Sequence, residues 1–200
     1  AYGLLKNSAD TGDPRALLEL GRLAAWPEED GSSRPDLAKA KRYLRAALAR
    51  GHYTAADPLV FVLLQESDDR HSAEEALDIL DSYSSKRDYR QNFDTYAIRE
   101  TFVLVHLGAR FNDKIKKFGL QNKLDRSRAL EMLADTDELA MVIDTADFII
   151  ESEDPYPYEF MTKSEFLPTI KLLEKQASDA DNDFFSEANG LLSDYHYYGS

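Results

Sequence analysis

The sequence predicts an all-α protein, an α/α superhelical solenoid of stacked antiparallel helix pairs. Apolar residues recur with a spacing near 3.6 in each periodic segment, and no segment alternates convincingly between apolar and polar residues as a strand would. Alanine and glycine mark faces on which two helices could approach closely. A repeat of 39 residues separates Ala16 from its equivalent Ala55, which is close to the period of stacked helical hairpins.

The stretch from Asp13 to Gly51 is the clearest helical hairpin. Its first helix presents Ala16, Leu20 and Ala24 on one face, and its second helix presents Ala40, Leu44 and Ala47. Asp36 precedes the second helix as an N-cap, and Gly51 follows it where a residue with a left-handed conformation would end the helix. We expect Gly21 to lie where the two helices cross.

The rest of the chain continues the helical pattern on both sides of this hairpin. Further helices are predicted over residues 2–11, 55–64, 72–83, 96–108, 127–134, 137–150, 164–177 and 188–199. Ser72 and Glu75 have the spacing of a capping box, and Ser164 is expected to cap a helix whose first turn tolerates Pro168. Residues 84–93 are polar and basic, and they are interpreted as a connection.

The predicted domain organisation is one continuous solenoid. Residues 1–125 form helical repeats, and residues 126–200 continue them with an acidic composition. Pro155 and Pro157 interrupt the helices of the second part, because two prolines this close cannot lie inside a helix. The chain is expected to begin and end in the middle of a repeat, as part of a longer array.

Charge is distributed unevenly along the chain, whose formal net charge is −13. Residues 126–200 carry 5 Lys and Arg against 17 Asp and Glu, whereas residues 1–60 carry 9 against 8. The acidic segment repels phosphate backbones and anionic head groups, so nucleic acid and membrane surfaces are poor partners for it. A basic protein partner explains this charge, and so does solubility alone.

Residue types that carry chemistry are sparse. The chain has no cysteine, which excludes disulfides and thiol catalysis, and its four histidines, His52, His71, His106 and His196, have no metal-ligand spacing. Asp179, Asp181 and Asp183 begin like a calcium loop, but Phe184 occupies the position of the required glycine. No phosphate-binding glycine loop or nucleophile elbow occurs. We therefore expect no enzymatic activity, no metal and no cofactor.

The motifs of the central hairpin resemble a known repeat family. They read Ala16-x3-Leu20-Gly21, then Asp36-x2-Lys39-Ala40-x2-Tyr43-Leu44-x-Ala46-Ala47-x3-Gly51. This spacing resembles the Sel-one-like repeat (SLR) of the tetratricopeptide (TPR) superfamily. The resemblance implies a non-enzymatic scaffold for protein–protein interaction.

Residues 1–66 also resemble one group of SLR proteins, the AlgK family of alginate-export scaffold lipoproteins. The resemblance rests on Pro14-Arg-Ala-x3-Leu20-Gly21, the long polar loop after it, and Lys41-Arg-Tyr-Leu-x2-Ala-x3-Gly51. It implies a bacterial periplasmic protein of an exopolysaccharide secretion complex, held at the outer membrane by a lipid anchor outside this sequence. Its partners would be an export porin or a component of the synthase complex. No apolar run here approaches the roughly 20 residues of a membrane span, so no direct membrane insertion is expected.

A second class of function stays open, an SLR immunity or adaptor protein that binds and inhibits a basic secreted toxin or an enzyme. In either class, loops on a rigid scaffold are expected to carry the binding residues. The candidates for partner binding are Trp26, Tyr156, Tyr158, Phe160, Asp179, Asp181, Asp183, Tyr195 and Tyr198. The tyrosines near residues 195–198 also suit a packing role, because the SLR pattern places a tyrosine near the end of a first helix.

Overall fold

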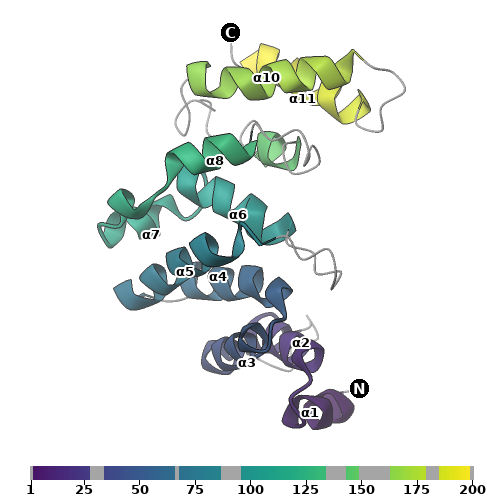
Figure 1. The fold of residues 1–200 in the computed structure, drawn as a ribbon, viewed down its shortest axis with the longest axis vertical. Coiled ribbons are helices and arrows are strands. Elements are labelled where there is room, and N and C mark those ends of the chain that lie inside the picture. The colour runs from purple at the N-terminus through teal and green to yellow at the C-terminus, as the bar shows by residue number, and fades with distance from the viewer. Residues whose placement is uncertain are drawn as a thin grey trace. The chain divides into compact units, whose positions relative to one another are not determined.

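The structure is a computed structural model of the chain. It describes residues 2–27, 34–65, 68–86, 96–133, 143–148, 163–178 and 185–198, with the backbone alone at residues 163, 166, 185 and 194–198. All secondary structure in these ranges is helical, as the sequence predicts (Figure 1). The α-helices α1–α8 are Tyr2–Asp10, Pro14–Ala25, Leu37–Ala49, Ala56–Gln65, Arg70–Tyr83, Tyr96–Leu107, Asn112–Lys117 and Arg126–Leu133. A short helix over 143–148, α10 (Lys163–Ala177) and α11 (Phe185–Tyr198) follow, and 3-10 turns lie at Tyr53–Ala55 and Gln121–Lys123.

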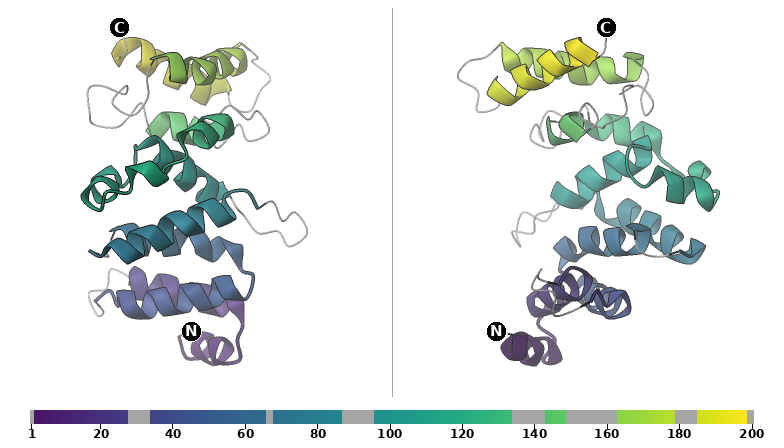
Figure 2. Two further views of the ribbon diagram at one scale, coloured as in Figure 1. Left: turned by 60° about the vertical axis from the view of Figure 1, so that its left-hand side comes forward. Right: turned by 180° about the vertical axis from the view of Figure 1, so that it is seen from behind.

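The chain divides into two compact units. The first comprises residues 1–101 and 113–123, and the second comprises residues 102–112 and 124–200. In the first unit, each of the helices α1 to α4 packs on the helix that follows it along the chain. Figure 2 shows α1, the α2–α3 pair and the α4–α5 pair following one another in this order. In the second unit, α10 packs against α11.

The α2–α3 hairpin is built from the residues that the sequence singles out. Leu20, Ala40, Leu44 and Ala47 are all buried, with at most 1% of their surface exposed. A Cβ atom added at Gly21 would lie 2.6 Å from Leu44 Cγ and 2.7 Å from Leu44 Cδ2. Real Cβ atoms essentially never come so close to another side chain, so the crossing predicted at Gly21 is confirmed and depends on the missing side chain.

The helix ends predicted at Asp36 and Gly51 are also confirmed. The Asp36 carboxylate accepts a hydrogen bond from the Lys39 amide at 3.0 Å and caps α3, and Asp13 caps α2 in the same way. Gly51 has φ +81° and follows the last turn of α3. An L-residue rarely adopts this conformation, which explains the glycine.

Two predicted caps are wrong. The helix α5 begins at Arg70, and its N-cap is Asp69, whose carboxylate accepts hydrogen bonds from the amide and the hydroxyl of Ser72 at 2.8 Å each. An aspartate three residues before Ser72 therefore replaces the predicted capping box. The helix α10 begins at Lys163, which places Ser164 inside the helix instead of before it.

Candidate functional site

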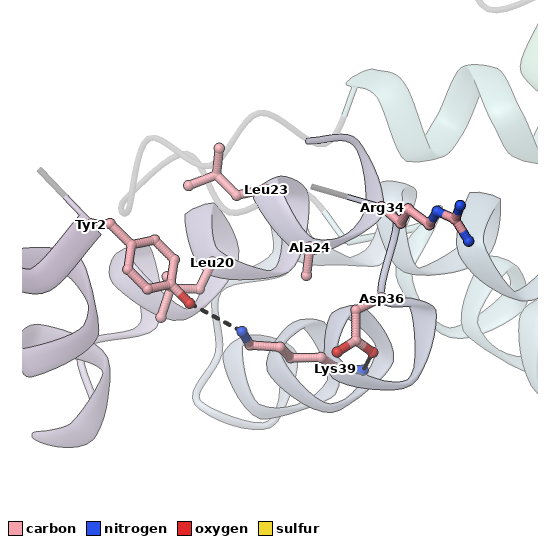
Figure 3. Close-up of a pocket in the computed structure, with 7 residues that line it drawn as sticks. All are labelled: Tyr2, Leu20, Leu23, Ala24, Arg34, Asp36 and Lys39. Carbon is pink, nitrogen blue, oxygen red and sulfur yellow. Dashed lines mark hydrogen bonds between the residues drawn. The ribbon is translucent and has the colours of Figure 1, made fainter. Parts of the chain in front are cut away.

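A pocket of about 380 Å³ opens in the first unit between α1, α2 and the start of α3 (Figure 3). Its lining residues come from three segments of the chain that are separated in sequence. They are Tyr2, Leu20, Leu23, Ala24, Arg34, Asp36 and Lys39. The volume lies within the range of pockets that hold small ligands or side chains of a partner.

The apolar wall of the pocket comes from the last two turns of α2. Leu20 is buried in the hairpin core, whereas Leu23 and Ala24 are half-buried and face the pocket. The chain returns to α2 after the loop, because the Asp36 amide donates a hydrogen bond to the Ala24 carbonyl at 2.8 Å. This contact fixes the start of α3 beside the end of α2.

The other end of the pocket is closed by a contact between α1 and α3. Lys39 Nζ donates a hydrogen bond to the Tyr2 hydroxyl at 3.0 Å, and it lies 5.7 Å from the centre of the Tyr2 ring. The hydrogen bond that Lys39 donates to the phenol raises the pKa of Lys39, so the ammonium group stays charged. Figure 3 shows the Lys39 side chain extended toward Tyr2, and the Arg34 guanidinium pointing away from this pair.

Three large apolar side chains are exposed at positions that lie close in sequence to the residues lining the pocket. Tyr2 is 49% exposed, Leu4 is 76% exposed, and Trp26, which ends α2, is 45% exposed. Trp26 is the one tryptophan of the chain and a predicted partner-binding residue. Its exposure suits that role, and partner binding by Trp26 stays a prediction.

The other predicted binding residues cannot be placed in a site. Tyr156, Tyr158, Phe160, Asp179, Asp181 and Asp183 lie outside the described residues. Tyr195 and Tyr198 lie in the last part of α11, residues 194–198, where only the backbone is described.

Of the histidines whose side chains the structure describes, His52 and His106 are buried and His71 is exposed. His106 stacks on Phe102 with ring centres 3.9 Å apart, and its Nδ1 accepts a hydrogen bond from the Asp125 amide at 2.7 Å. Burial lowers the pKa of His106 to about 4. The ring is therefore neutral at pH 7 and serves as a packing residue that ties α6 to the start of α8.

The described ranges contain no group of three or more histidine, aspartate or glutamate side chains arranged to hold a metal ion. Within the same ranges, no helix combines the length and the apolar character needed to cross a membrane.

Comparison of the chain with protein-family models, with curated proteins and with solved structures finds no match. The candidate site therefore rests on its own geometry.

Sequence reasoning found Trp26 but missed the pocket. Tyr2 and Lys39 are 37 residues apart, and no local spacing indicates that their side chains meet. Leu23 carries no separate signal for the pocket. It lies three residues after Leu20 and seven after Ala16, at the edge of the predicted hairpin face, so its apolar character is already explained by that face.

Proposed function

We propose that this chain is a non-enzymatic scaffold of the SLR type that binds a protein partner through the surface formed by Leu4, Trp26 and the pocket between α1, α2 and α3. The observation that carries the proposal is that the first unit exposes Leu4 and Trp26 and holds a pocket lined by residues of α1, α2 and the start of α3. Exposed apolar groups on a rigid scaffold are typical of binding surfaces.

The SLR assignment is supported by the way consecutive helices pack. Each of α1 to α4 packs on the next helix, and the α2–α3 crossing depends on the small residue that the repeat pattern requires at Gly21. We propose that this packing continues as a superhelical solenoid of antiparallel helix pairs.

The biological setting follows from the sequence resemblance of residues 1–66. We place the chain in the periplasm, in an exopolysaccharide synthesis and export complex of the alginate type, with an export porin or a synthase component as its partner. Its net charge of −13 disfavours direct binding of an anionic polysaccharide, which favours a protein partner.

The test is co-purification from the native host with variants of the proposed surface. Leu4→Ser combined with Trp26→Ser should reduce capture of the partner at least about fivefold, because exposed aromatic and aliphatic anchors dominate binding energy. Leu167→Ser is a matched control, since Leu167 is 46% exposed and lies on α10 in the second unit. Capture that is equal for the double variant and the wild type would place the binding surface elsewhere.

The identity of the captured protein decides between the two classes of function. A porin or a synthase component supports the export scaffold. A small basic toxin supports the alternative, an immunity or adaptor protein that uses its acidic residues 126–200. In that case, changing Asp179, Asp181 and Asp183 to lysine should slow association and flatten its salt dependence.

A further inference from the structure

The cations that line the pocket differ from several others that the structure describes. Arg45 pairs with Glu75, Arg126 pairs with Glu165, and Lys114 and Lys117 pair with Asp68. Among the residues that the structure describes, no carboxylate lies in hydrogen-bond or ion-pair contact with Lys39 Nζ or with the Arg34 guanidinium. Lys39 instead donates to the neutral phenol of Tyr2.

Asp36, the one acidic side chain among the described lining residues, is already engaged. Asp36 accepts the amide of Lys39 and caps α3, so part of its charge is balanced by the helix N-terminus. The remaining charges are the ammonium of Lys39 and, at the rim, the guanidinium of Arg34. The described lining therefore carries two cations and one carboxylate, in a chain of net charge −13.

An apolar wall lies next to this charge. Leu23 and Ala24 are half-buried, and both line the same pocket as Lys39. A ligand that fills the pocket must therefore combine an anionic group with apolar surface.

We propose that the pocket binds an acidic segment of the partner protein, with a glutamate or aspartate side chain on Lys39 and a neighbouring aliphatic side chain against Leu23 and Ala24. The carboxylate replaces the Tyr2 phenol as the acceptor for Lys39, because a hydrogen bond between two charged groups is about twice as strong as one with a neutral partner. This inference rests on the proposed function and names the chemistry of the partner at that site.

The test uses two blocked tripeptides, acetyl-Leu-Glu-Leu-amide and acetyl-Leu-Gln-Leu-amide, which have no free terminal carboxylate. Each is titrated into the full chain while amide chemical shifts of α2 and α3 and the fluorescence of Trp26 are followed. The glutamate peptide should bind about three- to tenfold more tightly than the glutamine peptide, and its affinity should fall with added salt.

Variants of the chain locate the effect. Lys39→Gln should remove the preference for glutamate, and Lys39→Arg should retain it, because arginine keeps the charge. Lys6→Gln is the matched control, since Lys6 is an exposed cation of α1 that does not line the pocket. Tyr2→Phe should leave the preference intact, because it removes only the competing acceptor.

The outcomes separate this inference from the proposed function. Equal binding of the two peptides, binding without shifts in α2 and α3, or no binding overturns the acidic-segment proposal. If Leu4→Ser with Trp26→Ser still reduces capture of the native partner in that case, the scaffold function stands without it. If the glutamate preference depends on Lys39 but the double variant captures the partner normally, the pocket binds acidic segments and the proposed partner surface is wrong.

Discussion

The α2–α3 hairpin of the first unit and a cluster of the second unit hold their helices together by different kinds of contact. This second group, the His106 cluster, consists of Phe102, His106, Asp125 and Arg128. In the hairpin, Gly21 removes a side chain so that Leu44 can fill the space, and the contact is apolar. In the cluster, a buried imidazole accepts a backbone hydrogen bond and stacks on an aromatic ring, which lies 4.5 Å from the Arg128 guanidinium.

The difference predicts how each region responds to a perturbation. An apolar contact of fixed shape is sensitive to added volume and is indifferent to pH. A buried histidine is sensitive to protons, because the charged form loses its water and its acceptor function. Hydrogen exchange measured separately for the amides of α2–α3 and of α6–α8 can therefore distinguish the two regions.

The largest expected effect is the pH dependence of the second unit. The pKa of His106 is about 4 in the folded chain, below its ordinary value of 6.5, so between these values the unfolded chain binds a proton that the folded chain does not. The contribution of His106 to stability is therefore fully present above about pH 6.5 and is lost as the pH falls toward 4, by about 3 kcal/mol.

Urea unfolding at pH 7, 5.5 and 4.5 measures this loss, and hydrogen exchange of the α6–α8 amides shows where in the chain it occurs. His106→Leu should flatten the dependence, although it lowers stability at pH 7 by leaving the Asp125 amide without its acceptor. His71→Gln is the control, because His71 is exposed. An unchanged slope in His106→Leu would show that other groups carry the acid sensitivity.

The next effect is steric and concerns the first unit. Gly21→Leu should destabilise the α2–α3 hairpin by about 1–3 kcal/mol, because even its Cβ atom overlaps the buried Leu44. Adding Leu44→Ala should restore part of this loss, which a double-mutant cycle by chemical denaturation measures.

Gly190→Leu is the matched control for Gly21→Leu. Gly190 lies inside α11, and a Cβ atom there meets nothing within 4 Å in the described structure. Removal of a helix-interior glycine should then be neutral or stabilise by up to about 1 kcal/mol. A similar destabilisation at both positions would contradict the close-packed crossing.

These two regions also differ in how far the sequence predicts them. The Gly21 crossing and the left-handed Gly51 could be predicted because both depend on residue type within one helical hairpin. Local spacing of small residues determines such a contact, so the pattern contains the information.

The His106 contact could not be predicted in the same way. His106 and Asp125 are 19 residues apart, and α7 with a 3-10 turn intervenes. The pairing of a ring nitrogen with one backbone amide depends on how that connection folds, and no periodic pattern expresses it. The pocket was missed for the same reason, because it forms where Tyr2 and Lys39 meet across 37 residues.

A smaller loss of stability, equal in the two regions, is expected when the helix cap of each is removed. This comparison tests whether the two regions also differ outside their cores. Asp36 caps α3 through the Lys39 amide at 3.0 Å, and Asp125 caps α8 through the Arg128 amide at 3.1 Å. Asp36→Ala and Asp125→Ala should each cost about 1 kcal/mol in urea unfolding. A much larger loss in Asp125→Ala would indicate that its side chain also supports the position of His106.

The smallest effect compares an ion pair from each unit. Arg126 makes two hydrogen bonds to Glu165, at 2.9 and 3.0 Å, and its third donor reaches the Leu107 carbonyl at 3.0 Å, so it joins α8, α10 and the end of α6. Arg22 and Glu19 on α2 make one contact of 3.5 Å, with both side chains about half exposed. Glu165→Gln should lower the free energy of unfolding by about 0.5–1 kcal/mol. Glu19→Gln should change it by no more than about 0.3 kcal/mol, because a single long contact between exposed side chains contributes little to stability.

The salt dependence of these two substitutions separates the two ion pairs further. The Arg126 and Glu165 side chains are 37% and 27% exposed, so the pair is only partly shielded from solvent ions. Raising sodium chloride from 0.05 to about 0.5 M should therefore shrink the effect of Glu165→Gln without abolishing it, while any effect of Glu19→Gln disappears. The part that survives salt measures the geometric contribution of the paired hydrogen bonds. If none survives, Arg126 holds the three helices by charge alone, and the second unit depends on His106 and its apolar neighbours for its defined packing.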